Sequence, residues 1–243
     1  CALPIFAPGR SDADEPYAAA HNLLLAHAFA VREFRSRNLA GMIGISNNCD
    51  WREPVSDRPE DREAAQRALE FFYAWFSDPL VFGEYPRRMR DRLGRRLPEF
   101  SDADRKLVQG SCDFLGLNHY STAYAGAATE PVAVNIAGNG GMSDDQEVAL
   151  TEDPAWEKTD MEWNIVPWGF RKMLEWIGDR YPGLPIYVTE NGCACPDATR
   201  DEAVHDDQRC RFLTGYIAAM QEAKAPVRGY FVWSLIDNFE WCQ

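Results

Sequence analysis

Polar and aromatic side chains follow each of four short apolar segments of the sequence. These four sets are Ser46-Asn47-Asn48, Asn118-His119-Tyr120, Thr189-Glu190-Asn191-Gly192, and Trp233-Ser234 with the segment 237–241. Glu190 comes directly after Ile-Tyr-Val-Thr, and a carboxylate at the edge of a buried strand is costly to ionise unless hydrogen-bond donors face it. Amide and phenol groups at neighbouring strand ends supply such donors, and indole rings offer flat apolar faces that suit a sugar ring. Together these side chains indicate carbohydrate chemistry.

Short strands alternating with helices are expected to position these side chains. Apolar runs predict strands over residues 41–46, 114–118, 186–189 and 230–233. Helices are predicted over 14–37, 61–76, 168–180 and 206–223, with shorter ones over 85–93 and 101–110. Residues 121–160 are rich in Gly, Ala, Asn and Asp and are predicted to form a long loop with short strands. This alternation is typical of a parallel α/β fold, in which sites assemble at the carboxyl ends of the strands.

The spacing of the strands limits the architecture. Strand starts near residues 41, 113, 185 and 229 are separated by 72, 72 and 44 residues, so eight strands would need far more than the 243 residues present. A complete (β/α)₈ barrel has about 250 residues. The pattern therefore fits either a small open sheet with large insertions or half of a barrel. No repeat or linker divides the sequence, and we predict a single domain over residues 1–243.

The composition argues against several classes of partner and cofactor. Lys and Arg number 25 against 38 Asp and Glu, and the net charge of −13 opposes binding to nucleic acid or to an anionic membrane. The seven cysteines are scattered and odd in number, so we interpret them, including the C-x-C pair Cys193 and Cys195, as free structural thiols. Free thiols and the absence of an N-x-S/T sequon slightly favour a cytoplasmic location. No metal and no cofactor are expected. The chain opens with Cys1 and not Met, so we expect its true amino terminus to be missing.

Two motifs near the carboxyl end carry a resemblance to a known family. Val188-Thr189-Glu190-Asn191-Gly192 and the segment from Trp233 to Trp241 resemble the signatures of family 1 glycoside hydrolases, the β-glucosidase family. Further blocks follow in the family's order: Ala7-Pro8-Gly9-Arg10, Glu15-Pro16-Tyr17, the segment 21–28, Asp78-Pro79, Tyr85-Pro86, the segment 113–120 and Pro167-Trp168-Gly169-Phe170. Several collinear blocks make a chance match negligible.

The resemblance implies a fold and a reaction. The fold is a (β/α)₈ barrel, of which this chain covers about strands 5–8 and lacks the amino-terminal half and the last helix. The reaction is retaining hydrolysis of β-linked O-glycosides, or oligosaccharides, through a covalent glycosyl-enzyme. Glu190 matches the nucleophile, Tyr120 the tyrosine that hydrogen-bonds it and keeps it ionised, and Asn118 the amide beside it.

The resemblance also implies residues that bind the substrate. Glu240 and Trp241 match residues that bind glycone hydroxyls, and Trp233 matches a stacking platform. Asn48 and Trp163 match positions nearer the aglycone and the acid/base. From residue type alone, core packing is the ordinary role of tryptophan, and the motif reverses that interpretation for sugar contact. His119, not among these positions, is interpreted as a hydrogen-bonded strand-end histidine.

One part of the family pattern is missing. The family's acid/base is the Glu of an Asn-Glu-Pro signature, which does not occur in these 243 residues. Glu15-Pro16 is not this signature, because Asp14 and not Asn precedes it. The acid/base is therefore expected outside this chain, and the isolated chain is expected to turn over little substrate. The alternative is a catalytically inactive half-barrel remnant that binds sugar or has no function. Either way, four strands leave two open edges that favour self-association.

Overall fold

The computed structural model describes residues 12–128, 142–196, 199–236 and 238. The chain divides into two compact units, which are described separately. Unit 1 comprises residues 1–45, 54–113 and 125–150, and unit 2 comprises residues 46–53, 114–124 and 151–243. The single domain over residues 1–243 stays a prediction.

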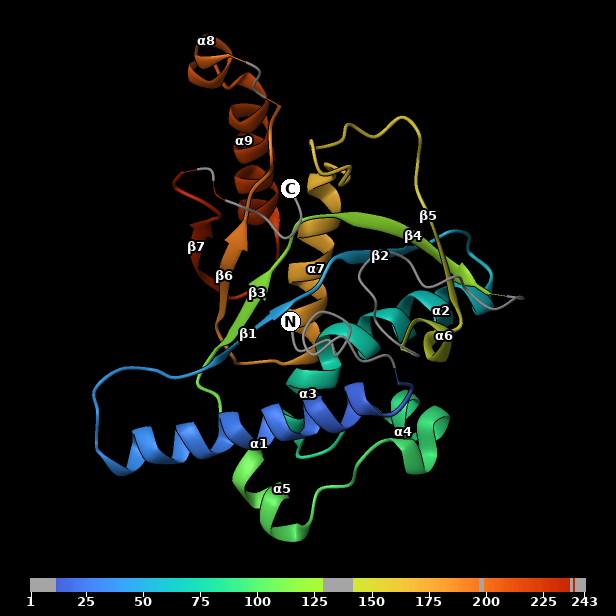
Figure 1. Cartoon of the computed structure of the whole chain (residues 1–243), viewed down its shortest axis with the longest axis vertical. Helices are drawn as coiled ribbons and strands as arrows, with labels where there is room; N and C mark the ends of the chain where they lie inside the picture. The colour runs from blue at the N-terminus through green and yellow to red at the C-terminus, as the bar shows by residue number, and fades with distance from the viewer. Residues whose placement is uncertain (1–11, 129–141, 197–198, 237, 239–243) are drawn as a thin grey trace. The chain divides into compact units, whose positions relative to one another are not determined.

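The strands that carry the site form a sheet of four. They are β1 (Ile45–Asn48), β3 (Leu115–Asn118), β6 (Ile186–Asn191) and β7 (Val227–Val232), in the order β1-β3-β6-β7 (Figure 1). β3 pairs in parallel with β6, and β6 in parallel with β7. Leu115, Leu117, Ile186 and Val188 are fully buried. These apolar residues drive the sheet to form, and the parallel pairing brings the polar strand ends together.

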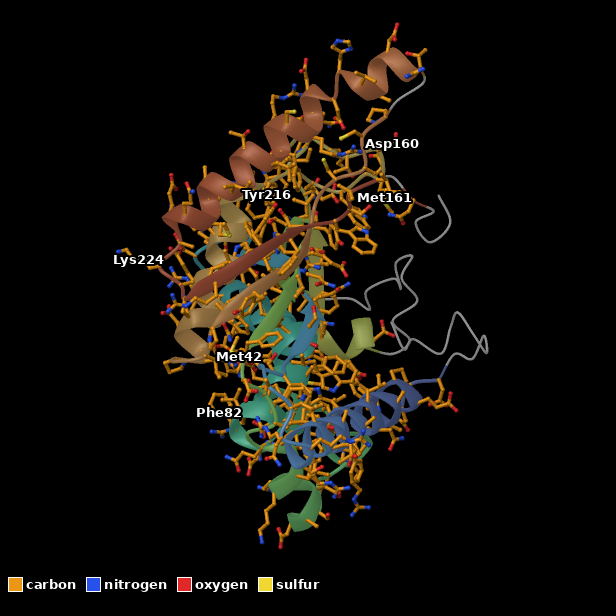
Figure 2. The ribbon with its side chains drawn as sticks, turned by 90° about the vertical axis from the view of Figure 1, so that its left-hand side faces the viewer. Met42, Phe82, Asp160, Met161, Tyr216 and Lys224 are labelled. Carbon is orange, nitrogen blue, oxygen red and sulfur yellow. The ribbon has the colours of Figure 1, made fainter. Side chains whose placement is uncertain are left out.

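Two helices of unit 2 pack against each other beside this sheet. They are α7 (Pro167–Arg180) and α9 (Asp207–Glu222), with the short α8 (Arg200–Val204) before α9. The rings of Phe170 and Tyr216 lie 5.4 Å apart, and Tyr216, labelled in Figure 2, accepts the Val166 backbone N–H at 3.0 Å. Gly169 lets the first turn of α7 lie close to Thr122, because a Cβ at this position would lie 2.1 Å from Thr122 Oγ1.

Unit 1 is mainly helical. Its helices are α1 (Glu15–Ser36), α2 (Pro59–Leu69), α3 (Trp75–Phe82), α4 (Arg87–Leu93), α5 (Asp102–Val108) and α6 (Met142–Gln146). A π-helical turn (Glu70–Ala74) joins α2 to α3, and a 3₁₀ turn (Gly94–Arg96) follows α4. Asp145 on α6 connects α1 and the 3₁₀ turn. Its carboxylate accepts a hydrogen bond from Tyr17 Oη at 2.7 Å and forms an ion pair with Arg96.

A second sheet has three strands, in the order β2-β4-β5. These are β2 (Trp51–Pro54), β4 (Thr122–Ala127) and β5 (Val148–Thr151), and each contributes residues to both units. β4 and β5 lie within the segment 121–160, for which a loop with short strands is predicted. β2, α6 and α8 are not predicted from the sequence, and α6 lies in the segment for which a loop is predicted.

Most predicted elements are confirmed, with changed boundaries. The strand predicted to start at residue 41 starts at Ile45. The reason is that Ile43 bonds to Asp113 and not to a neighbouring strand: its N–H donates to the Asp113 carboxylate at 2.9 Å, and its C=O accepts the Asp113 N–H at 2.7 Å. The strand predicted from residue 230 already starts at Val227. The helix predicted over residues 61–76 continues through the π-helical turn to Phe82 and ends at Gly83, where φ is 77°.

Candidate active site

The carboxylate of Glu190 meets the phenol of Tyr120 at the carboxyl ends of β6 and β3. Tyr120 Oη donates a hydrogen bond of 2.5 Å to Glu190 Oε2. The ladder places Asn118 opposite Glu190, with a register shift after Leu117. Both side chains of the pair are half-buried, so the carboxylate has a fixed donor while part of it still reaches solvent.

Asn118 lies in a cluster of hydroxyl groups from the neighbouring strands. Its Oδ1 lies 2.6 Å from Thr189 Oγ1 and 3.0 Å from Ser46 Oγ, and the two hydroxyl oxygens are also in hydrogen-bond contact, so two hydroxyl protons are shared among these three contacts. These contacts join the ends of β1, β3 and β6. Thr189 and Ser46 are therefore supporting residues that the sequence reasoning placed in the strand-end sets without assigning them a role.

Asp50 fixes the backbone at Tyr120, a role that sequence reasoning missed. Its Oδ1 accepts the N–H groups of Tyr120 (3.2 Å) and Ser121 (2.9 Å), and its Oδ2 lies 3.8 Å from an Arg52 nitrogen. The position of this acid, two residues beyond Asn48 after a strand, is the only signal in the sequence that could have pointed to it.

Asn191 joins three strands directly beside Glu190. Its Nδ2 donates to the His119 carbonyl at 2.6 Å, and its Oδ1 accepts Tyr230 Oη at 2.7 Å. The His119 N–H in turn donates to the Glu190 carbonyl at 3.0 Å. Asn191 is fully buried, so these bonds hold the end of β6 between β3 and β7. The sequence motif contained Asn191 but did not indicate this role.

His119 is a buried neutral histidine. Its Nδ1 lies 3.0 Å from the Cys49 carbonyl, an arrangement in which Nδ1–H donates, and its ring packs near Phe170 and Tyr216. Complete burial lowers the pKa of His119 to about 4, although Asp50 and the bond to Cys49 act in the opposite direction. This geometry agrees with the structural role expected for His119.

The remaining predicted residues lie at different distances from this centre. The Trp163 ring lies 5.2 Å from the Tyr120 ring at an interplanar angle of 55°. Trp233 is 44% exposed, and its backbone N–H donates to the Asn191 carbonyl at 3.0 Å. Asn48 is exposed at the end of β1, which β3 separates from the strand that carries Glu190. Glu240 and Trp241 lie outside the described residues.

A glycine is required where the β6 end meets the β7 end. A Cβ on Gly192 would lie 1.9 Å from the Trp233 carbonyl oxygen, closer than any real side chain allows. Gly192 therefore lets the loop after Glu190 run against the residue predicted to stack on the sugar. The peptide bond between Trp233 and Ser234 is cis.

Neither a metal cluster nor a membrane-spanning helix occurs in the described part of the chain. Within residues 12–128, 142–196, 199–236 and 238, no three His, Cys, Asp or Glu side chains gather in a way that could hold a metal ion. Over the same ranges, no helix has the length and apolar character needed to cross a membrane.

Comparison with known proteins identifies the family. The profile of "Glycosyl hydrolase family 1" matches residues 2–243. The chain belongs to glycosyl hydrolase family 1. Among curated relatives of this family 1 chain, beta-glucosidase 4 of Oryza sativa subsp. japonica is 40% identical over 97% of this chain and 51% of that protein. Coniferin beta-glucosidase of Pinus contorta is 39% identical over 99% of this chain and 49% of that protein.

Solved structures of family 1 enzymes have the same fold. Beta-glucosidase 2 of Trichoderma reesei, in complex with Tris, gives a TM-score of 0.89 at 39% identity and covers 99% of this chain and 54% of its own. A beta-glucosidase of Humicola insolens, in complex with glucose, gives a TM-score of 0.88 at 36% identity. That match covers 98% of this chain and 54% of the other chain. These similarities confirm the predicted family and barrel fold class. The chain spans about half the length of the curated relatives it matches.

Proposed function

We propose that the protein to which this chain belongs is a retaining β-glycosidase in which Glu190 is the nucleophile. The observation that carries the proposal is the 2.5 Å hydrogen bond from Tyr120 Oη to Glu190 Oε2 at the ends of two paired strands. A carboxylate held by one oxygen keeps the other oxygen directed for attack. Membership of family 1 supports the same assignment.

The proposed reaction needs two carboxyl groups about 5–5.5 Å apart. Glu190 attacks the anomeric carbon, and the acid/base protonates the departing oxygen and later activates water. Asp50 does not fit the second role, because its Oδ1 is occupied by two backbone N–H groups and its Oδ2 faces Arg52. We place the acid/base in the half of the family's length that this chain does not span.

The remaining predicted residues would bind the substrate. Trp233, Glu240 and Trp241 would hold the glycone, and Asn48 and Trp163 would lie nearer the aglycone. Asn118 would help position the nucleophile, since it bonds to Thr189 in the preceding position. One relative is named a coniferin beta-glucosidase, and one similar structure contains glucose, which supports a β-linked glucoside as substrate.

Azide rescue tests the role of Glu190 in the longer protein that contains this chain. The 2,4-dinitrophenyl β-glucoside has a leaving group that needs little protonation, so it reports on the nucleophile alone. We expect Glu190→Ala to lower kcat by at least about 10³-fold. Azide should restore turnover and give the α-glucosyl azide, because it enters from the face that Glu190 occupied. Hydrolysis by Glu190→Ala at the wild-type rate, or a β-configured azide product, would exclude Glu190 as nucleophile.

A second experiment distinguishes the catalytic role from the inactive-remnant alternative in the 243-residue chain itself. The chain is incubated with 2,4-dinitrophenyl 2-deoxy-2-fluoro-β-glucoside, and Glu190→Gln serves as the control. A functional nucleophile should be labelled within the tryptic peptide 181–200, which contains Glu190. Little turnover of ordinary aryl glucosides is expected, because general acid catalysis contributes about 10²–10⁴-fold. Labelling that is equal in the Gln variant would contradict the assignment.

Self-association is a separate proposal that rests on the sheet edges. Among the described strands, β1 and β7 are the outer members of the four-stranded sheet. Phe231 on β7 is 57% exposed, and Leu235 beyond it is 96% exposed. Outer strands with exposed apolar residues favour pairing with another chain. Light scattering with mass determination should give a species above the monomer mass, and a stable monomer at micromolar concentration would rule the pairing out.

A further inference from the structure

Two cysteines lie in contact in the loop that follows the nucleophile strand. Cys193 Sγ and Cys195 Sγ are 3.4 Å apart, and both residues are free thiols. A disulfide has an S–S bond of about 2.0 Å, so the two sulfur atoms must approach by little more than about 1 Å to be joined. The pair is outside the machinery proposed for glycoside hydrolysis.

The two thiols differ in their access to solvent. Cys193 is 8% exposed, whereas Cys195 is partly exposed and lines a surface depression of about 590 Å³. Asp206 and Arg209 line the same depression and form an ion pair at 2.7 Å. A small oxidant can therefore reach the sulfur of Cys195, while Cys193 is protected and lies behind it.

The two thiols differ in the effect that their mutual hydrogen bond has on each pKa. Burial raises the pKa of Cys193, and its hydrogen bond with Cys195 raises it further. Burial also raises the pKa of Cys195, but there the bond with Cys193 acts in the opposite direction, while Arg209 lowers and Asp206 raises the pKa of both thiols. We expect Cys195, the more exposed thiol, to ionise first, and the Cys193 sulfur then lies 3.4 Å from the thiolate.

The loop that holds the pair is fixed at several points. The Ala194 carbonyl accepts the N–H of Asp160, which is labelled in Figure 2, at 3.0 Å. The Cys193 carbonyl accepts Arg209 Nε from α9 at 3.4 Å. Because these contacts fix the backbone at Cys193 and Ala194, they help to keep the two sulfur atoms close to each other.

We propose that Cys193 and Cys195 form an oxidisable dithiol, which hydrogen peroxide or an organic hydroperoxide converts into a disulfide three residues beyond Glu190. With hydrogen peroxide, the Cys195 thiolate attacks a peroxide oxygen, the O–O bond breaks, and the departing hydroxide takes a proton to give water. Cys193 then attacks the sulfur of the Cys195 sulfenic acid, the S–O bond breaks, and the second oxygen leaves as water with the Cys193 proton. The two thiols lose two electrons and two protons, and one hydrogen peroxide becomes two waters.

Peptide mapping tests this proposal without any glycosidase measurement. Trypsin releases residues 181–200 as one peptide, in which Cys193 and Cys195 are the only cysteines. The reduced 243-residue chain is treated with hydrogen peroxide at pH 8.5, alkylated and digested. We expect both alkylation sites of this peptide to be lost together, with a mass decrease of about 2 Da that dithiothreitol reverses.

Single serine variants assign the two roles and serve as matched controls. In Cys193→Ser, the sulfenic acid of Cys195 should accumulate and react with dimedone. In Cys195→Ser, Cys193 should lose its thiol roughly tenfold more slowly, because it is buried. Exposed Cys210 in the same sample shows that the oxidant was active. The proposal is overturned if the peptide keeps two alkylatable thiols while Cys210 is oxidised, or if Cys195 pairs with a different cysteine.

Discussion

Tyr230 Oη donates a 2.7 Å hydrogen bond to Asn191 Oδ1, so β7 is connected by a side chain to the residue that follows Glu190. The other end of the Asn191 amide donates to the His119 carbonyl of the segment after β3. The proposed nucleophile therefore lies next to a buried amide that holds both neighbouring strands.

Replacing Asn191 should destabilise the sheet around the site. Asn191→Ala removes the partners of Tyr230 Oη and of the His119 carbonyl, and we expect the free energy of unfolding to fall by about 2–3 kcal/mol. Tyr230→Phe removes one of these bonds and should cost about 1 kcal/mol. Urea titration followed by tryptophan fluorescence measures both values. An equal loss in the two variants would show that the bond to His119 contributes nothing.

Removing the Tyr120 hydroxyl should affect turnover more than substrate binding. The bond to Glu190 Oε2 is made to a charged group, and losing such a bond costs about 1.5–3 kcal/mol. We expect Tyr120→Phe to lower kcat about 10- to 100-fold in the longer protein, with KM changed much less. Initial rates on an aryl β-glucoside give both constants. An unchanged kcat would mean that the hydroxyl does not assist the nucleophile.

Asp50 should act on catalysis through the position of Tyr120. Asp50→Ala removes the acceptor of the Tyr120 and Ser121 N–H groups, so kcat should fall in the same direction as in Tyr120→Phe. Asp50→Asn keeps an oxygen at this place and should retain most of the wild-type rate. If the Asn variant is as impaired as the Ala variant, the negative charge of Asp50 matters and not its geometry.

Stability should depend on pH through His119. Its pKa is about 4 when folded against an ordinary value of 6.5, so between these values the unfolded chain binds a proton that the folded chain does not. The folded state is thus favoured above pH 6.5, loses stability as the pH falls towards 4, and loses no more from this group below 4. From about pH 7 to about pH 5 this loss is roughly 2 kcal/mol.

The comparison with a non-titrating residue isolates this contribution. His119→Asn keeps a donor for the Cys49 carbonyl but cannot take up the proton. Its overall stability will be lower, and the difference between the two pH values should be smaller than in the wild type. Urea titrations at both pH values provide the measurement, and identical pH differences would assign the effect to other groups.

Local patterns explain which parts of the fold could be predicted. The helix predicted over residues 101–110 has a local start signal, because Ser101 Oγ accepts the Asp104 N–H at 3.1 Å at the beginning of α5. The apolar run before Glu190 predicted β6 in the same way. The start of β1 was misplaced because its backbone partner, Asp113, lies 70 positions away, and nothing near Ile43 in the sequence indicates that contact.

The site was predicted only where a motif supplied long-range information. Glu190, Tyr120 and Asn118 came from the family resemblance, and the structure brings all three to adjoining strand ends. Asp50 and the bridging role of Asn191 were missed, since each depends on a partner about 70 residues away or on another strand. Such roles depend on strand register, which residue types alone do not specify.

The pairing of β3 with β6 also has a consequence for the order of folding. Tyr120 and Glu190 are 70 residues apart, and closing a loop of that length costs about 4 kcal/mol of chain entropy before any contact compensates for it. Helices such as α7 need only local contacts and can form earlier. We therefore expect Glu190 to acquire its hydrogen-bond partner late. The amide of His119, which donates to the Glu190 carbonyl, should be among the last in unit 2 to gain protection in pulse-labelled hydrogen exchange.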